Sequence, residues 1–166
     1  MLFNSEIFLF LFLPLTLLVF YLLGHFGKIK LALATLVIAS LLYYGWWKPI
    51  YLPLILGSMT VNYVLGCLIQ KLQRSGATGK AALVVGIVFN LGLLGYFKYA
   101  NFAGDVAVDL GLLDHGIEDV VLPLAISFFT FQQIAFVVDV YRGREGESSF
   151  LKYLVFVTFF PQLIAG

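Results

Sequence analysis

The chain consists of long apolar runs separated by short polar links. Six runs contain no charged residue, and they cover residues 7–23, 31–47, 49–70, 81–97, 120–138 and 153–166. A helix needs about 20 residues to cross the hydrocarbon of a bilayer, and the first five runs come close to this length. No one-sided apolar stripe is present, as expected for helices covered on every face. The pattern predicts an all-α polytopic membrane protein with five to six transmembrane helices.

The segment after the fourth run follows a different pattern. Its apolar residues recur at helical spacing: Phe102, Val106, Leu110 and Leu113. Asp105 and Asp109 fall on another face of the same helix. We therefore expect a short interfacial helix on the outer surface. Beyond it the sequence shows no soluble domain, and residues 1–166 are interpreted as a single transmembrane domain.

Composition strengthens the membrane interpretation. Hydrophobic residues make up 61% of the chain and charged residues 11%, and the mean hydropathy is +1.00. Soluble domains contain about 25% charged residues, so soluble, disordered and nucleic-acid-binding classes are excluded. A formal net charge of +1 provides no surface for a nucleic acid. The single cysteine, Cys67, excludes an internal disulfide and a cysteine metal cluster.

Orientation follows from the positive charges in alternate links. One side of the membrane receives eight lysine and arginine residues, and the other receives only Lys48 and Lys98. The positive-inside rule makes the first side cytoplasmic and puts the N-terminus outside. The first run is interpreted as a retained span, because Glu6 precedes it without any lysine or arginine and no cleavage signal follows it.

The fifth run holds the densest set of polar residues within the spans. These residues are Ser127, Thr130, Gln132 and Gln133. They could line a polar tunnel, or they could form hydrogen bonds between packed helices. Asn62 and Asn90, in the third and fourth runs, are expected to bond each other across a helical hairpin.

Ionisable groups lie at the ends of the runs. Asp139 and Arg142, three residues apart, are expected to form an ion pair at the membrane boundary, as a structural anchor more than as catalytic groups. His115 lies among loop carboxylates, and His25 lies beside Lys28; solvated side chains explain both better than a metal site does. The sequence contains no recognisable nucleotide loop, zinc motif or nucleophile elbow. We therefore predict no catalytic residue and no metal in this chain.

Six blocks of sequence resemble the membrane-bound O-acyltransferase family, in the branch that contains bacterial alginate O-acetyltransferases. In chain order they are Leu2–Pro14 (LFNSEIFLFLFLP), Tyr43–Trp47 (YYGWW), Leu94–Phe102 (LGYFKYANF), Leu122–Gln132 (LPLAISFFTFQ), Asp139–Gly143 (DVYRG) and Phe159–Gly166 (FFPQLIAG). The resemblance covers the whole chain and implies a larger helical bundle, of which this chain would be the N-terminal third.

The resemblance implies transfer of an acyl group, often acetyl, to hydroxyls of an extracellular polysaccharide such as alginate. No bound cofactor is implied; the donor, acetyl-CoA or another carrier, would come from the cytoplasm. The implied partners are membrane lipid, the acyl donor, and the polysaccharide or a periplasmic acyl-accepting protein, at a bacterial inner membrane. The family's catalytic histidine lies later in the chain, in a motif without a counterpart here. Neither His25 nor His115 takes that role.

The last run also indicates a fragment, because 14 residues make a helix of about 21 Å against about 30 Å of hydrocarbon. This chain alone is then expected to be inactive. The alternative function is a non-enzymatic membrane subunit that scaffolds a polysaccharide modification or export complex. An ion-coupled transporter is disfavoured, because the runs contain no ionisable residue away from their ends.

Overall fold

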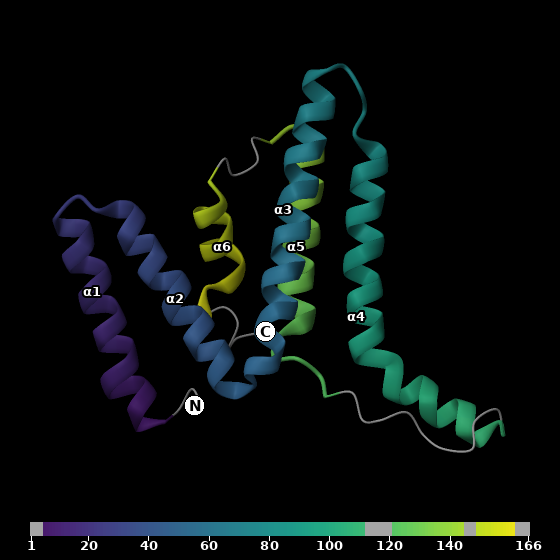
Figure 1. Cartoon of the computed structure of the whole chain (residues 1–166), viewed down its shortest axis with the longest axis horizontal. Coiled ribbons are helices and arrows are strands. Elements are labelled where there is room, and N and C mark those ends of the chain that lie inside the picture. The colour runs from purple at the N-terminus through teal and green to yellow at the C-terminus, as the bar shows by residue number, and fades with distance from the viewer. Residues whose placement is uncertain (1–4, 112–120, 145–148, 162–166) are drawn as a thin grey trace.

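The computed structural model describes residues 5–111, 121–144 and 149–161. All regular structure in these ranges is helical, as predicted. The elements are η1 (Phe8–Phe12), α1 (Leu13–His25), α2 (Ile29–Trp47), η2 (Pro49–Tyr51), α3 (Leu52–Arg74), α4 (Lys80–Asp109), α5 (Ile126–Tyr141) and α6 (Phe150–Thr158). Figure 1 shows α1 and α2 as one hairpin and α3, α4 and α5 as a second group, with α6 between α2 and α3 in the view.

Four helical segments are long and apolar enough to cross a membrane. They are Phe8–His25, Ile29–Trp46, Pro49–Arg74 and Lys80–Ala103, and α5 is a shorter apolar helix. Most of the residues on the first and fourth segments are not buried inside the structure. Exposed apolar side chains on this scale require lipid or further protein around them. The predicted fold class, an all-α polytopic membrane protein, is confirmed.

The interfacial helix expected after the fourth run is continuous with α4. This helix has 30 residues and ends at Asp109. Figure 1 shows it bending sharply, so that its last turns run sideways from the helical group. Leu113 of the predicted apolar stripe, and His115 with its neighbouring carboxylates, lie outside the described residues.

The fifth helix begins later than the apolar run predicts. Residues 121–125 are not helical, and α5 starts after Ala125, whose φ of 53° is left-handed. Pro123 explains the late start, because proline has no amide hydrogen and also disfavours the helical conformation in the residue before it. The sixth run likewise differs, since α6 covers Phe150–Thr158 and residues 162–166 lie outside the described part.

Three helices end in the same glycine-capped geometry. Gly27, Gly76 and Gly143 follow the ends of α1, α3 and α5 with φ of 69°, 82° and 82°. In each case the glycine amide bonds the carbonyl three residues earlier, and the next amide bonds the carbonyl five residues before itself. This is the Schellman motif, which satisfies carbonyls that a helix end leaves free. The three ends lie on the side predicted to be cytoplasmic.

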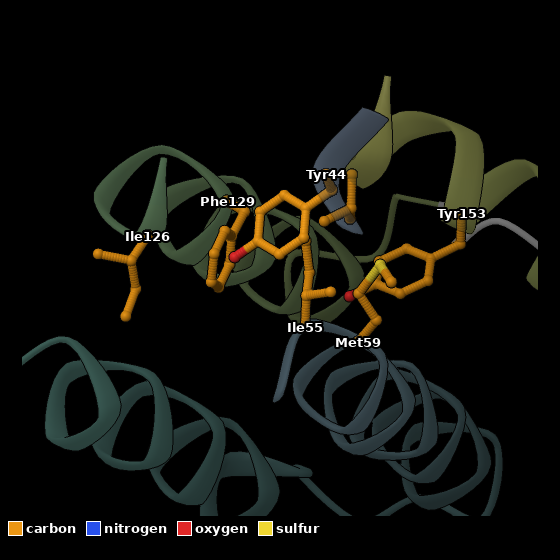
Figure 2. Packing of buried hydrophobic residues seen from close by; sticks show 7 residues of the cluster. Tyr44, Ile55, Met59, Ile126, Phe129 and Tyr153 are labelled. Carbon is orange, nitrogen blue, oxygen red and sulfur yellow. The ribbon is translucent and has the colours of Figure 1, made fainter. Parts of the chain in front are cut away.

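The largest apolar cluster joins α2, α3, α5 and α6. Its buried members are Tyr44, Ile55, Met59, Ile126, Phe129, Tyr153 and Val157. Figure 2 shows the rings of Tyr44 and Tyr153 within this cluster, near Ile55 and Met59. The cluster attaches α2 and α6 to the second helical group, so it positions the polar residues that lie deeper in that group.

Candidate functional site

Three amide side chains meet in the interior between α3, α4 and α5. Asn62, Asn90 and Gln133 each have 0% relative exposure. Asn62 Nδ2 donates to Asn90 Oδ1 at 3.2 Å, and Asn90 Nδ2 donates to Asn62 Oδ1 at 2.6 Å. This reciprocal pair confirms the predicted bond across the α3–α4 hairpin.

Gln133 connects α5 to this pair. Its Oε1 accepts one hydrogen bond from Ser58 Oγ at 2.7 Å and another from Asn62 Nδ2 at 2.5 Å. Polar groups in hydrocarbon must find partners inside the protein, and contacts of this kind contribute about 0.6 kcal/mol each. We call Ser58, Asn62, Asn90 and Gln133 the amide network. It holds three helices in one register.

Local helix geometry explains how the sequence builds the network. Ser58 precedes Asn62 by four residues, so both lie on one face of α3, and Asn62 Nδ2 also donates to the Ser58 carbonyl at 2.9 Å. On α4, Asn90 Nδ2 donates to the Gly86 carbonyl at 2.7 Å. A Cβ on Gly86 would lie 3.2 Å from Val137 Cγ1, so the glycine lets α5 approach closely. Ser58 was not predicted from the sequence, although its four-residue spacing from Asn62 was an available signal.

Two hydrogen-bond donors on α5 remain unsatisfied beside the network. Gln133 Nε2 and Thr130 Oγ1 are fully buried and have no partner among the described residues. A buried donor without an acceptor costs about 1–3 kcal/mol. The interior of this helical group therefore has hydrogen-bonding capacity that its own packing does not use.

The four polar residues predicted on the fifth run do not form one continuous wall. Gln133 and Thr130 are buried, whereas Ser127 is half-buried. Gln132 Nε2 instead donates to the Phe156 carbonyl of α6 at 3.2 Å. The polar face therefore divides between the network side of α5 and the α6 side.

Two buried tyrosine hydroxyls were not identified from the sequence. Tyr44 and Tyr153 are each 1% exposed, and neither hydroxyl has a partner among the described residues. Tyr44 lies near the end of an apolar run, where a tyrosine is also typical of an aromatic belt at the membrane surface. Figure 2 shows it inside the apolar cluster, with its hydroxyl beside Phe129 in the view. The signal was missed because a belt tyrosine and a buried tyrosine look alike in a single sequence.

The boundary ion pair forms with a different arginine. Arg144 Nη1 lies 3.2 Å from Asp139 Oδ2, and the described part of the chain shows no such bond to Arg142. The cap of α5 explains the exchange. Gly143 turns the chain back, and the Arg144 amide bonds the Asp139 carbonyl at 3.1 Å. Arg144 is thereby placed next to Asp139, where the three-residue spacing had favoured Arg142.

The network contains only neutral side chains, so it can orient or bind a polar group but supplies no general base. Within the described residues no group of three or more histidine, cysteine, aspartate or glutamate side chains could hold a metal. His25 is exposed at the end of α1.

Sequence comparison identifies relatives that match the chain from end to end. A probable alginate O-acetylase, AlgI, of Pseudomonas aeruginosa is 38% identical over 174 aligned positions. The alignment includes all of this chain and 32% of that protein. A peptidoglycan O-acetyltransferase of Helicobacter pylori is 37% identical, with all of this chain and 36% of that protein aligned.

The AlgI protein of Azotobacter vinelandii is 36% identical, and 34% of its length is aligned with the whole of this chain. The chain thus spans about a third of the length of the curated relatives it matches. No family model matches the chain. No solved structure matches it either.

Proposed function

The chain is homologous over its whole length to these O-acetyltransferases of the membrane-bound O-acyltransferase family, and on this basis we propose that it forms part of such an enzyme. The transferred group is acetyl, and the acceptor is a hydroxyl of an extracellular polysaccharide. The observation that carries the proposal is identity of 36–38% across all of the chain to relatives that are named for two different polymers.

The described helices supply support and polar lining to this enzyme, and the general base lies elsewhere. The amide network keeps α3, α4 and α5 in register, and its buried donors, Thr130 Oγ1 and Gln133 Nε2, are available to an acceptor group. Carbonyl and hydroxyl oxygens of an acyl donor or of a sugar are acceptors of this kind. This role combines the two interpretations of the fifth run, since some of its polar residues pack helices and others face a polar ligand.

The test measures acetyl transfer by the native protein that contains this chain. Membranes from cells that produce it are incubated with labelled acetyl-CoA, and O-acetyl esters are counted on added alginate and on added peptidoglycan. We expect label on one polymer and none in membranes that lack the protein. A stable, membrane-inserted protein that transfers no acetyl group to either polymer, but co-purifies with export or modification proteins, would favour the scaffold function instead.

A substitution connects the activity to the described helices. Gln133→Leu removes the unsatisfied Nε2 and both acceptor contacts of Oε1, so we expect acetyl transfer to fall at least tenfold. Thr60→Val on α3 is the matched control, because the Thr60 hydroxyl is exposed and bonds only the Leu56 carbonyl of its own helix. Equal activity in the two variants would remove the network from the proposed mechanism.

A further inference from the structure

Two helix ends enclose a basic groove far from the amide network. The last residue of α3 is Arg74 and that of α5 is Tyr141, and Gln73 Nε2 joins the two ends by donating to the Tyr141 carbonyl at 2.7 Å. Two adjoining hollows lie here and share Gln73 and Gly143. Arg74 and Arg144 line the first hollow, and Arg142 lines the second. We call the combined surface the arginine groove.

Among the described residues, only part of the positive charge of the groove is neutralised. Asp139 pairs with Arg144, and this is the one salt bridge within the described ranges. Arg74 and Arg142 are exposed and have no carboxylate partner in the described part of the chain. Arginine side chains near helix C-termini stabilise the helix through its dipole, but this effect needs only a positive charge and no particular arrangement of side chains. Three arginines at two helix ends, lining two adjoining hollows, go beyond this need.

The backbone leaves the groove open between its charged walls. Gly76 and Gly143 cap the two helices with left-handed φ, and a Cβ on either would meet nothing within 4 Å. Thr78 also lines the second hollow and offers a hydroxyl donor. The groove thus presents planar, bidentate donors and a hydroxyl around an open space at the end of two apolar helices.

We propose that the arginine groove binds a phosphate group. Guanidinium groups match the oxygens of phosphate in pairs and hold them by charge-assisted hydrogen bonds. The groove lies at the end of the spans on the side predicted to be cytoplasmic, where the phosphates of anionic lipids are concentrated. The same chemistry would receive the phosphate of a soluble ligand. The proposal does not depend on acetyl transfer, because it rests on the geometry, the charge and the predicted membrane side of the two helix ends.

The experiment measures phosphate binding with two probes on the native protein that contains this chain. One probe is inorganic pyrophosphate, added to protein in neutral detergent and followed by calorimetry. The other is phosphatidylglycerol, compared with phosphatidylcholine in nanodiscs and followed by native mass spectrometry of retained lipid. Binding of pyrophosphate assigns a soluble ligand, and selective retention of phosphatidylglycerol alone assigns a lipid headgroup. The absence of both overturns the proposal.

Matched variants separate a specific site from net charge. Arg74→Gln with Arg142→Gln is expected to weaken binding at least tenfold. Lys28→Gln with Lys30→Gln removes the same charge from two exposed positions, one just before α2 and one in its first turn, and binding should stay within twofold of wild type. Equal losses in the two double variants would overturn the proposal, because they would show that charge alone attracts the probe.

A third variant guards against loss of structure. Arg74→Lys with Arg142→Lys keeps both positive charges at the helix ends but lacks the planar donor pair, so an intermediate loss of about threefold to tenfold is expected. Helix content and the unfolding temperature of all variants are recorded by circular dichroism. Full binding by the lysine variant would contradict a guanidinium-specific phosphate site.

Discussion

Asn62 makes hydrogen bonds to both neighbouring helices of its group. Its Nδ2 lies within bonding distance of Asn90 Oδ1, Gln133 Oε1 and the Ser58 carbonyl, and its Oδ1 accepts from Asn90. Because Nδ2 has two hydrogens and three nearby acceptors, at least one hydrogen is shared. Removing this amide takes away the donor that Asn90 Oδ1 uses and leaves Gln133 Oε1 with the Ser58 hydroxyl alone.

Asn62→Leu is therefore expected to lower the free energy of unfolding by about 1–3 kcal/mol. Asn62→Leu combined with Asn90→Leu should cost less than the sum of the two single variants, because the second change removes a group that the first left unpaired. Unfolding in detergent, followed by circular dichroism, supplies the four free energies of the cycle. Strictly additive losses would mean that the two asparagines are not energetically coupled.

Replacing Thr130 should have the opposite effect on stability from replacing Asn62. Its buried hydroxyl has no described partner, so Thr130→Val removes an unsatisfied donor with almost no change in shape. We expect stability to stay unchanged or to rise by up to about 1 kcal/mol, while acetyl transfer falls if the hydroxyl contacts a ligand.

Thr158→Val is the control for Thr130→Val, because the equally buried Thr158 hydroxyl donates to the Leu154 carbonyl at 2.8 Å. This control should lose about 1 kcal/mol of stability. A larger loss in Thr130→Val than in Thr158→Val would show that the Thr130 hydroxyl has a partner after all.

At the scale of the elements, α3 and α5 approach each other closely at a glycine. A Cβ on Gly66 would lie 2.7 Å from Phe136 Cε1, and the Phe136 ring cannot move freely because its centroid is 4.4 Å from that of Tyr153. Gly66→Ala is expected to destabilise the protein by about 1–3 kcal/mol.

Gly57→Ala on the same helix is the matched control for Gly66→Ala. A Cβ there meets nothing within 4 Å, so helix propensity should make the change neutral or stabilising by up to about 1 kcal/mol. Thermal unfolding of both variants in one detergent provides the comparison. Equal effects of the two substitutions on stability would mean that α3 and α5 do not pack closely at Gly66.

The cap of α5 offers a second test at this scale. Gly143 has φ of 82°, and a side chain in the left-handed region costs about 1–2 kcal/mol. Gly143→Ala should lose this amount of stability, whereas Gly92→Ala, inside α4 and open to its surroundings, should lose none. The free energies of unfolding of the two variants provide the comparison. An unchanged stability of Gly143→Ala would mean that α5 does not end in this left-handed cap.

Sequence patterns predicted the elements better than their ends and partners. Apolar runs identified the long helices, because hydrocarbon length and backbone hydrogen bonding constrain them directly. The start of α5 was missed because the apolar run continues through Pro123, and hydropathy does not report the backbone break. Asn62 and Asn90 were paired correctly because a short link makes α3 and α4 neighbours. The third member, Gln133, required knowledge of how α5 packs against them.

At the scale of the whole molecule, the two helical groups differ in how far they are covered. Within the described part, α2 of the α1–α2 hairpin packs against α6, and Phe8, Tyr43 and Phe160 form an aromatic cluster. Most of α1 is uncovered. Figure 1 shows α1 on the outer edge of the structure, away from α3, α4 and α5. We infer that lipid or further protein covers this edge, because its exposed leucine and phenylalanine side chains are unsuited to water.

Orientation in the membrane is the prediction on which the cytoplasmic assignment of the arginine groove depends. The positive-inside rule places the α3–α4 link inside and the α2–α3 link outside. In a Cys67→Ser background, Ile50→Cys should react with an impermeant maleimide when the outer barrier of the cells has been opened and the inner membrane is still intact. Ser75→Cys, in the α3–α4 link, should react only after the inner membrane is opened. The reversed pattern would put the groove outside, where soluble cytoplasmic phosphates cannot reach it, and a lipid headgroup would be the remaining ligand.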